Sequence, residues 1–154
     1  MYDSQPGYPG RRDTPQVDAG RLWAGGVATA FIAALIAIVG DLIARGVLDI
    51  PVLAPESHGT WHTASLLPYA IAAAGGALLA TGLMHALALT TPRPTMFFGW
   101  ILFLVGVVVA VWPFTTGADL DAKIATAILD VIIVLAIWSL VDGTARRTVR
   151  LPGR

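Results

Sequence analysis

The chain lacks cysteine altogether and has little charge of either sign. Without cysteine, disulfide bridges, thiolate catalysis and cysteine-ligated metal sites are excluded. Only 13% of the 154 residues are charged and 56% are hydrophobic, whereas a soluble domain of this size needs more charge to cover its surface. Asparagine is also absent, and lysine occurs once against nine arginines, a composition typical of GC-rich bacterial genomes. The composition therefore indicates a bacterial membrane protein.

Four long apolar stretches divide the chain, and they lie at residues 22–44, 66–89, 97–112 and 124–141. Crossing ~30 Å of hydrocarbon takes roughly 20 apolar residues in a helix, so each stretch is long enough or nearly so. We expect an all-α, four-helix transmembrane bundle over residues 21–145, between a disordered cytoplasmic tail (1–20) and a basic tail (146–154). The short, proline-interrupted connection TTPRPT predicts that the second and third spans form an antiparallel hairpin.

The basic residues gather on alternate connections between the spans. Only Arg45 and Lys123 fall on one side, and the other side carries Arg11, Arg12, Arg21, Arg93, Arg146, Arg147, Arg150 and Arg154. Cytoplasmic loops carry the excess of arginine and lysine in membrane proteins. We therefore predict a multi-pass protein of the bacterial cell membrane with both termini in the cytoplasm. Contact with anionic lipid explains the basic tail, so no nucleic-acid partner is expected.

Asp130 is the residue of the fourth span that costs the most free energy to place in the membrane. It lies roughly 16 Å below the start of that helix near Asp119, close to mid-membrane, where a carboxylate costs on the order of a few kcal/mol. The residue should therefore face the bundle interior, be protonated or meet a partner. Thr126 on the same helix, with Thr29 and Thr81 on others, are the expected hydroxyl partners. Asp130 either locks the fourth helix to its neighbours or takes part in proton or cation movement.

Asp41 and His85 are secondary candidates within the spans. Asp41 lies near the outer end of the first span, where it can pair with Arg45 one helical turn away. The alternative is a polar, water-accessible vestibule on the outer face. His85 lies towards the cytoplasmic end of the second span, and we expect it to hydrogen-bond a neighbouring carbonyl or hydroxyl. Its separation from Asp130 along the membrane normal exceeds ~10 Å, so a direct relay between them is not expected.

Two weaker patterns resemble metal sites. His58 and His62 have a spacing that zinc sites use on a helix, but the intervening glycine opposes a helix and Glu56 is the only nearby third ligand. Asp119 and Asp121 lack a third acidic ligand, and we expect them to stabilise the first turn of the fourth helix instead. The sequence therefore predicts neither a metal site nor a cofactor.

Small residues indicate where the helices approach one another. Gly25 and Gly26 permit close packing of the first span. In the second span Ala72, Gly76 and Ala80 recur every four residues, a pattern typical of tight helix contacts. This stripe predicts packing inside one bundle or, alternatively, a dimer seam.

Several separated segments also resemble those of one known family, in the same order along the chain. They are RLWAGGVAT, IPVLAPE, TTPRPTMFFGW and PFTTGADLDAKIATAIL. Together they resemble an actinobacterial family of small four-span integral membrane proteins, a domain of unknown function. The resemblance covers roughly residues 20–145 and implies the fold and the membrane location. It brings no catalytic residues to this chain.

No phosphate-binding loop, nucleophile–base pair or paired carboxylate motif occurs in the chain, so we predict no enzyme. The leading hypothesis is a non-enzymatic structural or accessory component of a membrane assembly, in contact with the lipid bilayer and with a second copy or other membrane subunits. The alternative is a small oligomeric transporter or proton-coupled carrier that uses Asp130. A third hypothesis, a lipid-binding accessory to envelope synthesis, rests only on the amphiphilic outer loop.

Overall fold

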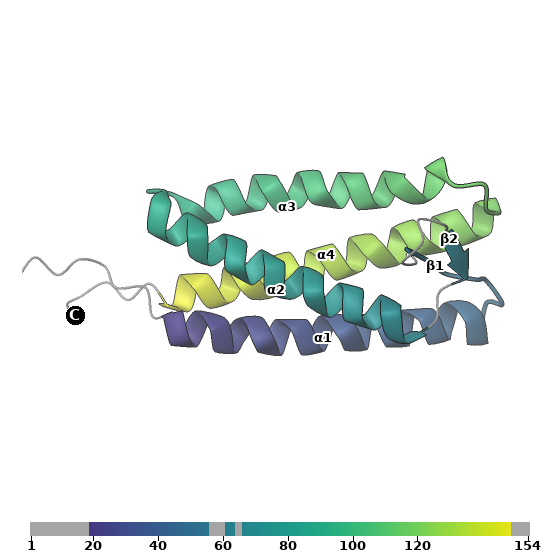
Figure 1. The fold of residues 1–154 in the computed structure, drawn as a ribbon, viewed down its shortest axis with the longest axis horizontal. Coiled ribbons are helices and arrows are strands. Elements are labelled where there is room, and N and C mark those ends of the chain that lie inside the picture. Colours follow the sequence, from purple (N-terminus) through teal and green to yellow (C-terminus); the bar gives the residue numbers. More distant parts are fainter. Residues whose placement is uncertain (1–18, 56–60, 64–65, 149–154) are drawn as a thin grey trace, which may run out of the picture.

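The computed structural model describes residues 19–55, 61–63 and 66–148. Its elements are α1 (Ala19–Gly46), β1 (Leu53–Pro55), β2 (Trp61–Thr63), α2 (Leu66–Thr90), α3 (Pro94–Val111), the 3₁₀ helix η1 (Trp112–Thr115) and α4 (Leu120–Thr148). The four long helices form a bundle in which the start of α1 and the end of α4 lie at the same end (Figure 1). We call this the termini end, and the opposite end, which carries β1 and β2, the β-hairpin end.

All four helices are long and apolar enough to cross a membrane, as the hydrophobic stretches predicted. Most of them extend beyond those stretches at one or both ends, whereas α3 ends at Val111, one residue earlier than expected. α3 begins at Pro94, whose fixed φ angle suits the first position of a helix. α4 runs to Thr148, with Arg146 and Arg147 in its last turn, where the helix dipole favours positive charge. The other residues of the predicted tails lie almost wholly outside the described part of the chain.

α1 approaches α2 and α4 closely because it carries glycines where these helices come nearest. A Cβ atom at Gly26 would collide with the side chain of Thr81 on α2, and one at Gly25 would collide with Thr144 on α4. Close backbone approach increases the van der Waals contact that holds membrane helices together. The predicted role of Gly25 and Gly26 is therefore confirmed.

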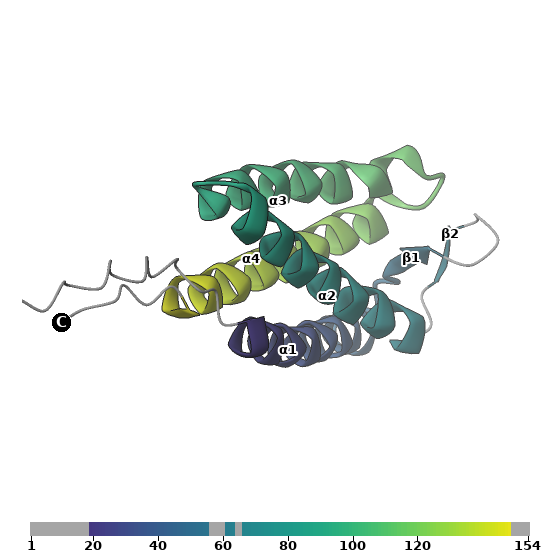
Figure 2. The same cartoon turned by 60° about the vertical axis from the view of Figure 1, so that its left-hand side comes forward.

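The predicted contact stripe of α2 is only partly a contact. Ala80 is buried, whereas Ala72 and Gly76 are exposed, and no described neighbouring atom lies within 4 Å of a Cβ built at Gly76. The packed face of α2 instead contains Tyr69, Ala70, Ala73, Ala77, Ala80, Thr81 and Met84. The prediction of a tight contact within the bundle is wrong for Ala72 and Gly76, because α2 leans away from α3 on this side (Figure 2).

α2 and α3 form the predicted antiparallel pair, joined at the termini end. The two helices move apart towards the β-hairpin end (Figures 1 and 2). α3 packs mainly against α4, with a smaller contact to α2. Only 11% of the most apolar stretch of α3 is buried, against 28–33% for the other three helices. The divergence leaves space between α2, α3 and α4.

The connection between α1 and α2 folds back into the end of the bundle. β1 and β2 pair antiparallel, with Leu53 opposite Thr63. Just before this pairing Val52 is completely buried, and Leu53 is 5% exposed. Val52 belongs to the same apolar core as the helices, so this part of the connection closes the bundle at the β-hairpin end.

Candidate functional site

Asp130 is held by a tyrosine from a neighbouring helix. The hydroxyl of Tyr69 on α2 donates a hydrogen bond of 2.7 Å to Asp130 Oδ1 on α4. Tyr69 is buried and Asp130 is half-buried. Because the two residues lie on different helices, their hydrogen bond joins α2 to α4.

The sequence reasoning missed Tyr69, although it is the only tyrosine in the four predicted spans. A tyrosine near the start of a span is usually interpreted as an interfacial anchor. In this structure its ring is buried and its hydroxyl points to the carboxylate instead. A lone tyrosine and a lone aspartate in otherwise apolar spans are the signal that could have paired them.

The threonines predicted to meet Asp130 bond elsewhere. Thr29 Oγ1 donates to the Gly25 carbonyl at 2.8 Å, and Thr81 Oγ1 donates to the Ala77 carbonyl at 2.9 Å. Both bonds lie within the threonine's own helix, where a hydroxyl reaches the carbonyl four residues back. The prediction that Thr29 or Thr81 meets Asp130 is therefore wrong.

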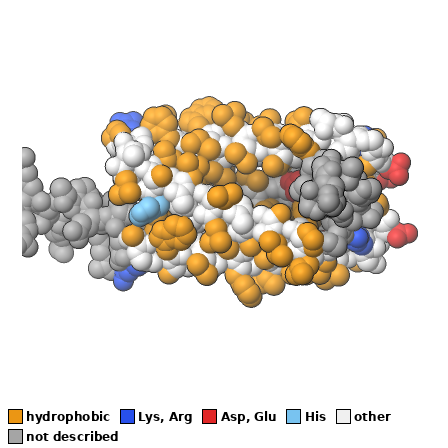
Figure 3. Space-filling model, in the orientation of Figure 1, with side chains coloured by type: hydrophobic (Ala, Val, Ile, Leu, Met, Phe, Trp, Pro, Cys, Tyr) orange, Lys and Arg blue, Asp and Glu red, His pale blue; other side chains and the backbone are white. Residues whose placement is uncertain are grey.

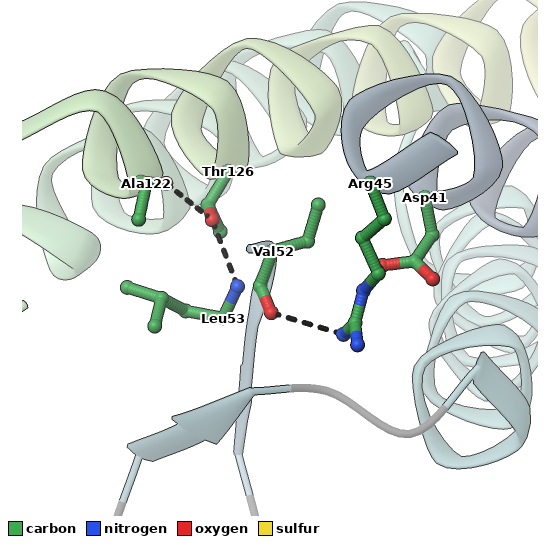
Figure 4. A network of polar contacts seen from close by, with 6 residues as sticks. All are labelled: Asp41, Arg45, Val52, Leu53, Ala122 and Thr126. Atoms are coloured by element: carbon green, nitrogen blue, oxygen red, sulfur yellow. Dashed lines mark hydrogen bonds and ion pairs between the residues drawn. The ribbon is translucent and has the colours of Figure 1, made fainter. Parts of the chain in front are cut away.

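The Thr126 hydroxyl bonds to the connection between α1 and α2, and not to Asp130. Its Oγ1 donates to the Ala122 carbonyl at 2.7 Å and accepts a hydrogen bond of 3.0 Å from the Leu53 N–H (Figure 4). Thr126 is 1% exposed, so it satisfies a backbone donor that is out of contact with water. Its predicted role as a partner of Asp130 is also wrong.

Asp41 and Arg45 form the predicted ion pair within α1, with 2.8 Å between Arg45 Nε and Asp41 Oδ1. Asp41 is 2% exposed, whereas the Arg45 side chain is 35% exposed, so the carboxylate of the pair is buried and the arginine is only partly buried. The Arg45 guanidinium also donates to the Val52 carbonyl at 3.4 Å (Figure 4). Asp41 therefore orients an arginine that holds the buried connection, and it does not line the cavity around Asp130.

A cavity of about 270 Å³ lies between α2, α3 and α4, next to the Asp130–Tyr69 pair. Its walls are Leu53, then Tyr69, Ala72, Ala73 and Gly76 of α2, Leu102, Val105 and Val109 of α3, and Asp130, Ile133, Val134 and Ile137 of α4. Apolar side chains cover most of this face, and acidic atoms are visible only towards the β-hairpin end (Figure 3). Among the described residues of its wall, one is acidic and one is a phenol, and the others are apolar.

Asp130 lies near the β-hairpin end of this cavity, level with the first turn of α2. Tyr69 comes three residues after Leu66, the first residue of α2, which corresponds to about 5 Å along the helix. Leu53 of β1 lines the same cavity. The carboxylate is therefore close to the buried connection, rather than halfway along its neighbour α2.

Asp130 has unused hydrogen-bonding capacity. Its Oδ1 accepts the Tyr69 hydroxyl, whereas Oδ2 accepts no hydrogen bond from the described part of the chain, and no described lysine or arginine pairs with Asp130. A carboxylate can accept about four hydrogen bonds. The site can therefore bind a group that brings hydrogen-bond donors or positive charge.

His85 lies far from this site and faces α1. Its ring centroid is 6.5 Å from that of Trp23, and its Nδ1 is buried with no hydrogen-bond partner among the described residues. The expected bond to a carbonyl or hydroxyl is therefore wrong for Nδ1. His85 comes 16 residues after Tyr69, roughly 24 Å along α2, so the structure agrees that no direct relay joins it to Asp130.

The described structure gives no support to the two weaker metal-site patterns, His58 with His62 and Asp119 with Asp121. His58, Glu56 and the side chain of His62 lie outside the described residues. Asp121 is in the first turn of α4, and the Asp119 carbonyl accepts the Lys123 N–H at 3.1 Å. Within the described part of the chain, no three histidine, aspartate or glutamate side chains come together in a way that could hold a metal ion.

The four apolar helices and the intramembrane pair fit a small helical membrane protein. The chain belongs to a family of unknown function, DUF6069, whose sequence profile matches residues 17–147. The matched region contains all four helices except the last residue of α4, and it includes Tyr69 and Asp130. No curated protein and no solved structure matches the chain.

Proposed function

We propose that this protein is a non-enzymatic accessory component of a bacterial membrane assembly. The observation that carries the proposal is the use of its buried polar groups to hold the bundle together. Tyr69 and Asp130 join α2 to α4, and Thr126 and Arg45 hold the connection between α1 and α2. These side chains act as structural links, which suits a scaffold better than a catalyst.

The partner of this component, a second copy or another membrane protein, contacts α3 in our proposal. α3 is the least buried of the four helices, so its side is the most accessible to a further helix. A photo-crosslinking amino acid at Val108 on α3, 55% exposed, should give protein–protein crosslinks in native membranes. The matched position Val39 on α1, 53% exposed, should give fewer. A strictly monomeric protein in mild detergent, with no crosslink at either position, would contradict the proposal.

The proposed orientation places the termini end in the cytoplasm. Arg21, Arg93, Arg146 and Arg147 lie towards that end, whereas Arg45 and Lys123 lie towards the β-hairpin end. Because the chain has no cysteine, single cysteines report its topology directly. Gly117→Cys should react with an impermeant maleimide on intact cells, and Thr90→Cys only after permeabilisation. The reverse labelling pattern would overturn this orientation.

A second candidate function is that of a small carrier centred on Asp130. The specific observation in its favour is a carboxylate on the wall of a cavity between the helices, whose Oδ2 accepts no hydrogen bond from the described residues. Four spans are few for one transport pathway, so this function needs a dimer. Asp130→Asn should abolish proton-coupled flux in liposomes that contain a pH-sensitive dye, whereas Asp142→Asn, outside the cavity, should not. Equal flux in the wild type and Asp130→Asn would exclude it.

A further inference from the structure

We propose that the cavity between α2, α3 and α4 binds a small amphiphilic amine, with its ammonium group at Asp130 and its apolar body against the helices. This inference rests on the second candidate function for its site, and it names the class of ligand. It depends on three features of the cavity: its charge, its shape and its access.

The charge of the site favours a cation. Tyr69 is the only described residue that donates to Asp130, at 2.7 Å, and Oδ2 has no donor in the described part of the chain. An ammonium brings both positive charge and hydrogen-bond donors. Attraction between opposite charges is several times stronger in such an apolar environment than in water. A neutral alcohol supplies one donor without the charge, and an anion would be repelled.

The shape of the cavity limits the size of the ligand. Tyr69 and Gly76 are seven residues apart on α2, as are Asp130 and Ile137 on α4, so the cavity extends roughly 10 Å along the helices. Its volume of about 270 Å³ lies just below the usual range of roughly 300–1,000 Å³ for small-molecule sites. A compact apolar body fits this space, whereas a complete phospholipid does not.

Access to the cavity is from the side that lipid covers. Ala72, Gly76 and Val105 line the cavity and are exposed on the outside of the bundle. The described structure leaves open space where a side chain at Gly76 would stand. A ligand that partitions into the hydrocarbon can therefore enter between α2 and α3, and its ammonium group then meets Asp130 near the β-hairpin end.

Equilibrium binding of radiolabelled n-octylamine to the full-length protein in phosphatidylcholine nanodiscs tests this inference. The amine is protonated at about pH 7, as a lysine side chain is. Saturable binding is expected, with n-octanol displacing the label at least tenfold less well than unlabelled amine. Asp130→Asn, which keeps an acceptor for the Tyr69 hydroxyl, should weaken binding at least tenfold. Absence of saturable binding, equal competition by the alcohol or unchanged binding by Asp130→Asn would each overturn the inference.

A matched pair of glycine variants tests the location separately. Gly76→Leu fills the cavity and should weaken binding at least tenfold. Gly75→Leu adds the same side chain beside the cavity, where the described structure also leaves room, and should bind within twofold of the wild type. Equal binding by both variants would place the amine elsewhere and overturn the proposed site.

Amine binding in nanodiscs needs no proton gradient, so it tests this inference separately from the carrier function, which is tested by flux in liposomes. Amine binding that depends on Asp130, without flux in liposomes, would contradict the carrier and support the ligand class. Flux that depends on Asp130, without saturable amine binding, would support the carrier and overturn the ligand class.

Discussion

Replacing Thr126 with valine keeps the size of the side chain and removes the hydroxyl that holds the connection between α1 and α2. Thr126 Oγ1 accepts the Leu53 N–H at 3.0 Å, and Leu53 is 5% exposed. In the variant this N–H loses its acceptor while it stays out of water, which costs about 1–3 kcal/mol. The Ala122 carbonyl keeps its partner within the helix, so the loss falls on the connection.

Hydrogen–deuterium exchange of the Leu53 amide measures this loss directly. At about 1.4 kcal/mol per factor of ten, Thr126→Val should speed exchange roughly 5- to 150-fold. Thr29→Val is the matched control, because Thr29 is equally buried and its hydroxyl donates within its own helix. It should leave the Leu53 amide unchanged. Unaltered exchange in Thr126→Val, or equal acceleration in Thr29→Val, would refute the reasoning.

Two further predictions concern packing and charge, and both are measured as unfolding free energy in detergent. Gly26→Val forces a branched side chain into α2 and should destabilise the protein by about 1–3 kcal/mol; a similar loss in Gly82→Val, where the described structure leaves room, would contradict this. Arg45→Met strands the buried Asp41 carboxylate and should cost about 3–5 kcal/mol. Arg146→Met breaks an ion pair whose arginine is 70% exposed and should cost less than about 1 kcal/mol. Equal losses of unfolding free energy in Arg45→Met and Arg146→Met would contradict the conclusion that burial of Asp41 makes its ion pair more important.

Features that depend on neighbouring residues in the chain were predictable. Hydropathy located the four helices, and the prolines around Arg93 predicted the hairpin between α2 and α3. The pair of Asp41 and Arg45 followed from their spacing of one helical turn. None of these inferences requires knowledge of how the helices pack. How deeply each residue is buried did depend on that packing, and Asp41, expected in an interfacial ion pair near the outer end of the first span, is only 2% exposed.

Contacts between distant segments were not predictable in the same way. The hydrogen bonds of Tyr69 with Asp130 and of Leu53 with Thr126 join residues 61 and 73 positions apart. The first depends on the position of the start of α2 relative to α4 along the bundle, and the second depends on the connection between α1 and α2 folding back into the bundle. Thr29 and Thr81 gave no guide to these contacts, because each hydroxyl donates within its own helix. The phenol of tyrosine extends too far for that local bond and reaches the next helix instead.

The stripe of Ala72 and Gly76 shows why small residues are ambiguous in a membrane helix. The same small side chains permit close packing when a helix lies against them and leave a space when it leans away. Apolar residues surround α2 on every side, so hydropathy does not indicate its packed face. In this protein the stripe lines the cavity, in whose wall Asp130 has one oxygen without a donor among the described residues. The small residues that suggested a helix contact therefore leave the space in which a ligand of Asp130 would fit.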